Sequence, residues 1–387
     1  MTILHIAQPV DGGVARVLVD LVRGQQEAGH RVLVACPRGG RLADGAAAAG
    51  ALVQDWPARR SPGPATAAEV WRLRRIVRGA APDVLHLHSA KAGLAGRLAV
   101  RGAVPTVFQP HAWSFAAVEG PVAAATLRWE RYAARWAARV LCVSDQERQD
   151  GEAAGVRAAW AVVPNGVDTA HYAPAERRAA RMSLGLDLEA PLAVCVGRLC
   201  RQKGQDVLLA AWPEVLRRVP AARLALVGGG PDEAVIASTV RELAAPSGVR
   251  LAGDVPDPRP WLAAADLVVL PSRWEGMALA PLEAMASGRP VLLTDVPGAR
   301  ECLPPQERVR GVVPAGDPAA LAVGMARALA DPIECERRGS VARDHLERCH
   351  DVRAVVEQVD ELYRTVVRTG RAPAAAGRGD GRVPGRI

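Results

Sequence analysis

The sequence is almost without lysine: Lys91 and Lys203 are the only lysines among its 49 basic residues. Arginine presents a planar fork of donors and lysine a compact ammonium, so the two do not replace each other freely. A lysine kept in such a chain can mark a place where an ammonium is needed, although chance survival explains it as well. The surroundings of each lysine have to separate these explanations.

The sequence also lacks the patterns of several protein classes. None of its seven cysteines forms a CxxC pair and their number is odd, which predicts small buried thiols in a reducing compartment instead of a disulfide framework or zinc site. No apolar run reaches about 18 residues, so we expect no transmembrane helix. The first residues, MTILHIAQPV, lack the features of a signal peptide, so we expect a cytoplasmic protein.

The positive charge is concentrated in one place. The formal net charge is +8, and residues 368–387 supply +4 of it, from five arginines and one acid. Because this stretch is rich in Gly, Ala, Pro and Arg, we expect 369–387 to be a disordered basic tail. The chain has no zinc-finger spacing and no RNA-binding aromatic signature, so we expect no nucleic-acid partner.

Short apolar runs alternate with helical periods along the chain. This alternation predicts parallel sheets with helices on both faces, an α/β fold. The pattern restarts after residue 168, so we expect two doubly wound, Rossmann-like domains, 1–170 and 171–350, facing each other across a cleft. A last helix, 351–368, can cross back to the first domain. The expected strands are 2–7, 31–37, 83–89, 105–110 and 139–144, then 192–198, 223–230, 249–254, 266–272 and 290–295, and helices of the second domain are expected near Gln205, Pro231, Pro258, Ala278 and Pro297.

Polar residues cluster directly after the expected strands. Ligands of parallel sheets bind at the carboxyl ends of the strands, so these residues are candidates for a site in the cleft. The first domain contributes Gly12, Gly13, His88, Ser89, His111 and Ser144, and the second contributes Arg198, Lys203, residues 228–230, Asp254, Glu275 and Asp295.

Two of these loops suit phosphate. Gly12 and Gly13 lie between a strand and a helix, where a phosphate can approach the backbone and the helix N-terminus, although a plain turn explains the pair as well. Arg198 and Lys203 flank the loop GRLCRQKG, and two cations there can neutralise a diphosphate. A solvated pair of surface cations is the alternative. The presence of one of the two lysines favours the functional interpretation.

Two glutamates lie in PSRWEGMALAPLEAM. Glu275 is in the loop after a strand, and Glu283 follows Pro281 in what we expect to be the first turn of a helix. A glutamate there often only complements the helix dipole. A carboxylate on each side of the turn can also bind two parts of one polyhydroxylated ligand, because carboxylates are acceptors. No Asp or His cluster accompanies them, so a metal pair is less favoured.

Three histidines are further candidates. His111, in QPHAWSF, lies just past a strand among aromatic residues, where it can position a donor or share a proton, although a satisfied structural histidine is the more common case. His86 and His88 share one strand face and could ligate a metal, but the sequence shows no third ligand. We expect a structural role for His86 and a position at the cleft edge for His88.

Together these motifs resemble family-four retaining glycosyltransferases of the GT-B fold. The resemblance runs from about residue 3 to 301 and rests on the N-terminal GG, HSAKAG, PHAWSF, VSDQE, PNGVD, GRL-x3-KG, LVGGGP and, above all, E-x7-E followed by EAMASGRPV. HSAKAGLAGRLA and QPHAWSF resemble members that build extracellular or capsular polysaccharide. One departure is the alanine-rich GMALAPLEAM, with Pro281, where relatives carry bulkier or small polar residues.

The resemblance implies a role for each residue. Glu283 would hold the nucleotide ribose and Glu275 the donor sugar, with Gly276, Met277 and Ala278 completing that loop. Arg198 and Lys203 would bind the diphosphate and stabilise it as the leaving group. Gly12 and Gly13 would approach the phosphate or the acceptor, and His111 would lie beside the reacting sugar.

The resemblance also implies the reaction. A hexosyl unit would pass from a nucleoside-diphosphate sugar, UDP type favoured and GDP next, to a hydroxyl of a glycan, lipid-linked saccharide or small molecule, with retention and without a metal or other cofactor. A GT-B epimerase or phosphorylase and a non-catalytic sugar-nucleotide-binding protein are the alternatives. E-x7-E argues against an epimerase, and the lack of a pyridoxal-phosphate lysine segment argues against a phosphorylase. The intact set of Arg198, Lys203, Glu275 and Glu283 argues against a non-catalytic protein.

Two further expectations concern the acceptor and the membrane. Lys91, after His88, is expected to contact an acceptor phosphate, and His88 is grouped with it. Arginines and aromatic residues in 127–140, with further arginines in 59–79, suit peripheral contact with an anionic inner membrane face. A solvated face with buried aromatics is the competing interpretation.

Overall fold

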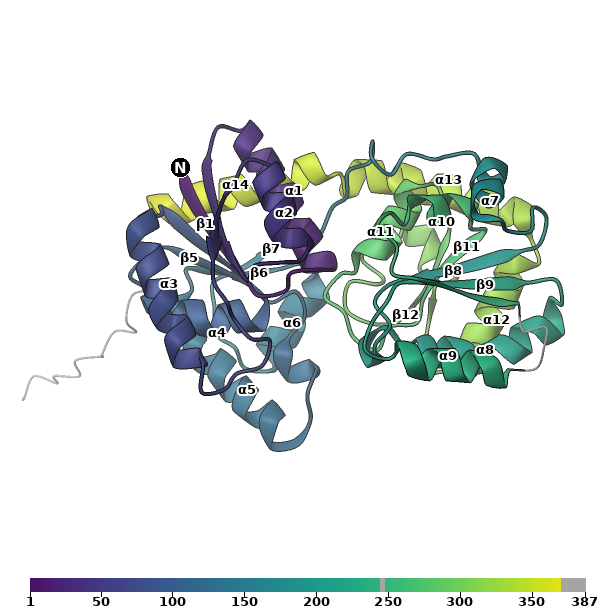
Figure 1. Cartoon of the computed structure of the whole chain (residues 1–387), viewed down its shortest axis with the longest axis horizontal. Helices are drawn as coiled ribbons and strands as arrows, with labels where there is room; N and C mark the ends of the chain where they lie inside the picture. Colours follow the sequence, from purple (N-terminus) through teal and green to yellow (C-terminus); the bar gives the residue numbers. More distant parts are fainter. Residues whose placement is uncertain (244–247, 370–387) are drawn as a thin grey trace, which may run out of the picture.

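A computed structural model describes residues 1–243 and 248–369 of the chain. Two α/β domains lie side by side, each built on one parallel sheet with helices on both faces (Figure 1). This architecture confirms the predicted pair of doubly wound domains. The expected tail, apart from Thr369, lies outside the described residues.

The first sheet has seven strands in the order β3-β2-β1-β4-β5-β6-β7. Most of its central residues are buried, because helices cover both faces of a parallel sheet. His5 pairs with His86, and Ala7 pairs with His88, across the β1–β4 neighbours. The strands are β1 (Thr2–Ala7), β2 (Arg31–Cys36), β3 (Leu52–Asp55), β4 (Val84–His88), β5 (Thr106–Gln109), β6 (Arg139–Cys142) and β7 (Trp160–Val162).

The helices of the first domain form two layers. Residues of α1 and α2 pack in one cluster against the sheet, and residues of α3 and α4 pack in another. The helices are α1 (Gly13–Glu27), α2 (Arg41–Ala48), α3 (Thr66–Ala80), α4 (Ser89–Val100), α5 (Gly120–Ala133) and α6 (Asp145–Ala153), with the 3-10 turns η1 (Ser114–Ala116) and η2 (Ala134–Trp136).

The second sheet has six strands in the order β10-β9-β8-β11-β12-β13. Its strands are β8 (Leu192–Val196), β9 (Arg223–Val227), β10 (Val249–Gly253), β11 (Leu267–Leu270), β12 (Val291–Thr294) and β13 (Val312–Val313). Its helices are α7 (Arg177–Leu184), α8 (Gln205–Arg218), α9 (Glu233–Glu242), α10 (Arg259–Ala264), α11 (Leu279–Ala286), α12 (Pro318–Leu329) and α13 (Pro332–Cys349), with η3 (Arg201–Lys203) and η4 (Pro305–Glu307).

The prediction of a helix that begins near Pro297 was wrong. The chain makes turns there and reaches only the short η4 before β13. Gly298 explains the turn, because its φ is 78° and a Cβ at this position would lie 2.3 Å from the carbonyl oxygen of Gly276. The segment therefore packs tightly under the loop that carries Glu275 instead of starting a helix.

The last helix, α14 (Val352–Arg368), lies across the first domain, where it contacts α1 and β4 (Figure 1). His30 and Asp360 join the two parts through a 2.9 Å contact. Gly24 of α1 faces Val356, and a Cβ there would lie 2.8 Å from the valine side chain. The glycine thus lets the two helices approach each other.

The chain passes between the domains twice, and the two crossings lie together. Val167 and Asp351 form a parallel bridge, and the Val167 amide donates to the His350 carbonyl at 3.0 Å. Over the described ranges, no helix is both long enough and apolar enough to cross a membrane.

Candidate active site

The strand orders define where a ligand can bind. In the first sheet the chain adds strands outward from β1 to β3 and then continues with β4 on the other side of β1. The second sheet has the same switch in strand order between β8 and β11. In doubly wound sheets the ligand crevice lies at the carboxyl ends of the strands on either side of such a switch. The loop with Gly12 and Gly13 follows β1, and His88 ends β4. The loops with Lys203 and Glu275 follow β8 and β11, so sequence candidates lie at both switch points.

Lys203 and Glu275 are brought into direct contact. Lys203 Nζ lies 2.5 Å from Glu275 Oε1, and both side chains are largely buried. The two loops are tied by a backbone hydrogen bond from Arg273 to Gln202, 2.8 Å long. Gly204 allows this approach, because its φ is 67° and a Cβ there would lie 2.1 Å from the Pro271 carbonyl oxygen. This lysine is therefore placed by its surroundings.

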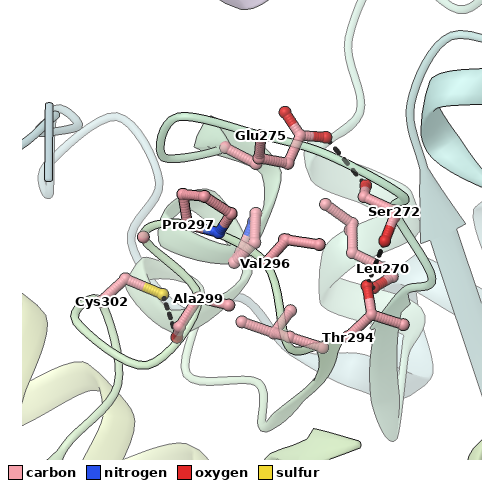
Figure 2. Close-up of a pocket in the computed structure, with 12 residues that line it drawn as sticks. Leu270, Ser272, Glu275, Thr294, Val296, Pro297, Ala299 and Cys302 are labelled. Atoms are coloured by element: carbon pink, nitrogen blue, oxygen red, sulfur yellow. Dashed lines mark hydrogen bonds between the residues drawn. The ribbon is translucent and has the colours of Figure 1, made fainter. Parts of the chain in front are cut away.

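Glu275 lines a small hollow beside the ends of β11 and β12 (Figure 2). Ser272 Oγ donates to Glu275 Oε1 at 2.8 Å, and Gln202 Nε2 donates to Oε2 at 3.3 Å. Ala278, the N-cap of α11, also lines the hollow, whose other walls are mainly apolar. The carboxylate is held in one orientation by neutral and cationic donors.

Arg198 follows β8 and is exposed. Gln205 Nε2 donates to its carbonyl oxygen at 3.1 Å, which fixes the backbone of the loop. Within the described residues its guanidinium forms no salt bridge, in contrast to Lys203. The site thus has one cation held by a carboxylate and one available to an anionic ligand.

Glu283 is buried, with only 1% of its side chain exposed. It is the fifth residue of α11, so the expectation that it lies in the first turn was wrong, and a dipole effect confined to that turn does not explain it. Arg16 of α1 reaches across from the first domain and places Nη1 2.6 Å from Glu283 Oε1. Glu283 Oε2 is buried and, in the part of the chain that is described, has no hydrogen-bond partner.

Tyr172, from the segment between the domains, completes this contact. Its hydroxyl accepts from Arg16 at 3.2 Å. Burial, and next the charge of Glu283, raise the pKa of Tyr172 above its usual range. Neither Arg16 nor Tyr172 was singled out from the sequence, because an isolated arginine in a chain so rich in arginine carries no signal.

The loop with Gly12 and Gly13 approaches the second domain at Gly13. Gly12 has a φ of 81°, a conformation that L side chains rarely adopt. A Cβ on Gly13 would lie 3.9 Å from the side chain of Leu279, which is the first residue of α11. Backbone amides of this loop therefore lie near the start of the helix that carries Glu283.

The loop after Glu275 is held by the first domain. Ser144 Oγ donates to the Gly276 carbonyl at 3.1 Å, and Asn165 Nδ2 donates to the Met277 carbonyl at 2.7 Å. A Cβ on Gly276 would lie 2.8 Å from Val143 and 3.0 Å from the Ala112 nitrogen. The domains are thus in close contact at the proposed donor loop.

His111 lies on a conformationally unusual loop beside Gly276. Its φ is 55° and that of Ala112 is 105°, both positive for non-glycine residues. Glu147 holds this loop: its Oε1 accepts from the Ala112 amide at 2.6 Å and its Oε2 from the Val143 amide at 2.8 Å. Burial raises the pKa of Glu147 to about 7. The sequence analysis missed Glu147, although Ser144 and Glu147 have the spacing of a capping box.

The structure supplies the third histidine that the sequence did not show. His5, His86 and His88 are completely buried, and their candidate ligand atoms lie within 4.8 Å of one another. However, both ring nitrogens of His5 and of His88 make hydrogen bonds, and the rings of His86 and His88 are only 3.9 Å apart. These contacts describe a hydrogen-bonded cluster more than a set of converging ligands.

His88 and Lys91, the expected acceptor contacts, are both buried. His88 Nδ1 lies 3.1 Å from His111 Nε2, so His88 reaches the cleft only through His111. Lys91 Nζ lies 2.6 Å from Glu69 Oε2 and donates to Thr66 Oγ1 at 3.2 Å. An acceptor phosphate would have to break this buried pair, and the contact stays a prediction.

Two parts of the chain match known families. Residues 190–331 match the family described as Glycosyl transferases group 1, and residues 11–171 match Glycosyltransferase Family 4. D-inositol 3-phosphate glycosyltransferase from Nocardiopsis dassonvillei is 33% identical over 319 residues, which are 76% of this chain and 73% of that protein. The chain belongs to the family 4 glycosyltransferases.

Other proteins resemble this family 4 glycosyltransferase. UDP-Gal:alpha-D-GlcNAc-diphosphoundecaprenol alpha-1,3-galactosyltransferase from Escherichia coli is 30% identical over 60% of this chain and 62% of that protein. The crystal structure of Anabaena HepE in complex with UDP-glucose has a TM-score of 0.82 at 23% identity, with 94% of this chain and 100% of that chain covered. The family and the GT-B fold predicted from the motifs are confirmed.

Proposed function

We propose that this family 4 glycosyltransferase moves a hexosyl unit, with retention, from a nucleoside-diphosphate sugar to a hydroxyl acceptor. The observation that carries the proposal is the contact between Lys203 and Glu275 at the β8–β11 switch point, with Arg198 on the same loop as Lys203 and Glu283 on α11, the helix that follows the Glu275 loop. The proposed site thus combines cations, which can bind phosphate, with carboxylates, which can accept hydrogen bonds from sugar hydroxyls.

The cations suit the leaving diphosphate. When the bond between C1 and the diphosphate breaks, negative charge builds on the departing oxygen. An ammonium has three N–H donors, so Lys203 can keep one on Glu275 and direct another to a phosphate oxygen. Arg198 adds a guanidinium that no described carboxylate neutralises. Fixed cations of this kind stabilise the transition state without a metal ion, which we also propose.

The carboxylates suit hydroxyl recognition. Glu283 keeps one buried oxygen free of protein donors, where a ribose hydroxyl can donate. Glu275, beside the cations, is placed for hydroxyls of the donor sugar, and His111 lies across the same loop. The acceptor hydroxyl then attacks from the face that the diphosphate leaves, so the anomeric configuration is retained.

Known proteins support the choice of substrate. HepE was solved with UDP-glucose, and the E. coli relative is named for a UDP-sugar donor and a lipid diphosphate acceptor. We therefore favour UDP, with GDP next, and a glycan, lipid-linked saccharide or small hydroxylated molecule as acceptor.

The first domain also offers a surface for an anionic membrane, and we propose peripheral contact there. Val122 and Tyr132 of α5 are 60% and 47% exposed, and the nearby Arg128 and Arg131 are exposed as well. Trp71 of α3 is 59% exposed, with Arg75 over its ring. Exposed apolar groups beside arginines favour an interface between water and lipid.

The function is tested by donor hydrolysis and transfer with purified protein, using UDP- and GDP-hexoses and a panel of acceptors, with and without EDTA. Lys203→Ala should lower kcat by roughly 100- to 1,000-fold, as removal of one preorganised charge-stabilising donor does elsewhere. NMR of the product then gives the anomeric configuration.

Arg201→Ala is the matched control, because Arg201 lies on the same loop but is 68% exposed and pairs with Glu119. It should keep activity near that of the wild type. Nucleotide binding with no transfer or hydrolysis would favour the non-catalytic reading, and equal loss in both variants would remove the specific role of Lys203.

A further inference from the structure

A continuous row of buried side chains connects His111 to helix α1. His111 Nε2 lies 3.1 Å from His88 Nδ1, and His88 Nε2 lies 3.0 Å from His5 Nδ1. His5 Nε2 then lies 2.8 Å from Gln25 Oε1. The row therefore runs from the cleft, through β4 and β1, to a glutamine on the far side of the sheet's histidines.

The three imidazoles are neutral near pH 7. Burial lowers the pKa of His5 to about 4 and that of His111 to about 3, and it lowers the pKa of His88 as well. A neutral imidazole has one N–H and one lone pair. Each hydrogen bond in the row therefore fixes the direction of the next one.

The side-chain oxygen of Gln25 determines which ring nitrogen carries the proton in each histidine of the row. Its carbonyl oxygen can only accept, so His5 carries its proton on Nε2 and leaves a lone pair on Nδ1. His88 then donates from Nε2 to His5, and His111 donates from Nε2 to His88. The remaining nitrogen, His111 Nδ1, is left with a lone pair. Among the described residues this nitrogen makes no hydrogen bond.

We infer that Gln25, through His5 and His88, holds His111 in the Nε2–H tautomer, so that Nδ1 presents an acceptor to the donor sugar. Gln25, His5 and His88 are thus positioning residues, and His111 is the residue that meets the ligand. If the amide of Gln25 were reversed, every bond would reverse and His111 would present an N–H instead.

The inference deepens the proposed function and rests on it for its consequence. The His111–Ala112 loop packs against Gly276, beside Glu275, so His111 lies next to the donor loop. An acceptor nitrogen favours a sugar hydroxyl and disfavours a carboxylate, which offers no proton. Donors with a neutral hexosyl group are therefore expected over donors with a hexuronic acid.

The tautomer is measured directly on the full chain with ¹⁵N-histidine. Two-bond ¹H–¹⁵N correlation spectra distinguish a protonated from an unprotonated ring nitrogen, and His111→Asn assigns the signals of His111. The wild type should show the Nε2–H form at His111 without any substrate. Gln25→Met removes the acceptor, so both tautomers of His111 should appear and kcat/KM for the donor should fall roughly two- to tenfold, the worth of one hydrogen bond.

Two further variants control the experiment. Gln25→Glu keeps an acceptor oxygen at the same place and should retain the wild-type tautomer. Gln26→Met makes the same change at the next position of α1, where Gln26 Nε2 donates to the Gly50 carbonyl oxygen at 2.5 Å, outside the row. It should change neither the His111 signals nor the donor kinetics.

The outcomes separate the two claims. An Nδ1–H tautomer in the wild type, or His111 signals that ignore Gln25→Met, would overturn the inference even if transfer occurs. The expected tautomer in a protein that transfers no sugar would leave the row intact and overturn only its catalytic use. Equal changes in Gln25→Met and Gln26→Met would show general loosening of helix α1 and also count against it.

Discussion

At the scale of single residues, Glu147 illustrates how a buried charge can hold a functional loop. Its two oxygens accept from the backbone amides of Ala112, next to His111, and of Val143, at the end of the neighbouring strand. An ionised carboxylate suits two amide donors, yet burial opposes ionisation and raises the pKa of this group to about 7. The loop that carries His111 therefore depends on a group that titrates near neutrality.

Glu147→Gln should change how stability depends on pH. The pKa of Glu147 is raised from the usual 4.5 to about 7 on folding, so its contribution is fully present below pH 4.5 and is lost as the pH rises through 7. Between pH 5 and 8 the wild type should lose roughly 2–3 kcal/mol of unfolding free energy that the variant does not lose. Urea unfolding at several pH values measures this difference.

Glu152→Gln is the matched control for that measurement. Glu152 lies on the same helix, but its side chain is 42% exposed and pairs with Arg148. Its pH profile should follow that of the wild type. A Glu147→Gln profile that also runs parallel to the wild type would mean that Glu147 keeps an ordinary pKa in the fold.

The site residues that the sequence could predict are those whose meaning lies in local spacing. Glu275, Glu283 and Lys203 belong to motifs that are readable along the chain. His5 and Gln25 could not be found in this way, because their contact with His88 depends on the pairing of β1 with β4 and on which face of α1 is turned inward. Arg16 depends further on how the two domains face each other.

At the scale of elements, α5 has aromatic residues on two sides, one packed against the domain and one exposed. Trp129 packs beside the guanidinium of Arg97, which pairs with Glu130 at 2.8 Å in the interior. Tyr132 and Val122 remain exposed. The helix therefore has a half-buried aromatic side and an exposed arginine-rich side, and membrane contact stays a prediction.

Val122→Glu should weaken binding to vesicles that contain phosphatidylglycerol. The change removes an apolar contact worth about 1.5 kcal/mol and adds a repelled charge, so binding should fall about tenfold or more. Co-sedimentation with anionic and with neutral vesicles measures the effect.

Val323→Glu provides the comparison, since Val323 is 46% exposed on α12 of the second domain. It should bind vesicles as the wild type does. The proposed face would be wrong if both variants lose binding equally, or if the wild type shows no preference for anionic vesicles.

Most strands of the sheets could be predicted, because short apolar runs between turn residues identify buried strands. The exceptions have physical reasons. The sequence missed β3, which has no fully buried residue, and also β7 and β13, which have only three and two residues, too few for a period. The segment after Pro297 has helix-forming residues, but its tight contact with Gly276 overrides that local preference.

At the scale of the whole molecule, Arg16 and Glu283 join the two domains through the proposed ribose site. Glu283 is nearly inaccessible, and the cation that pairs with it comes from the first domain. Glu301 makes a second connection, accepting from the amides of Asp145 and Gln146 at the start of α6. Binding in one domain is thereby linked to the position of the other.

Arg16→Ala should weaken UDP binding about tenfold. Without the guanidinium, the buried Glu283 carboxylate loses the partner that orients it, so it is less well positioned to accept a ribose hydroxyl. Isothermal titration of UDP into wild type and variant measures the loss, and scattering measures whether the domains move apart.

Arg23→Ala is the appropriate control, because Arg23 lies on the same helix and contacts only Asp20, at 3.3 Å, among the described acids. It should bind UDP normally. Unchanged affinity in Arg16→Ala would show that the Arg16–Glu283 pair plays no part in UDP binding.

The return of α14 to the first domain has a consequence for synthesis. The strands and helices up to β7 leave the ribosome early, but the surface that α14 covers, over α1 and β4, stays open until residues 352–368 have been made. The whole second domain is translated in between. The first domain to be synthesised is therefore the last to be completed, and its buried histidines are shielded only when nearly the whole chain exists.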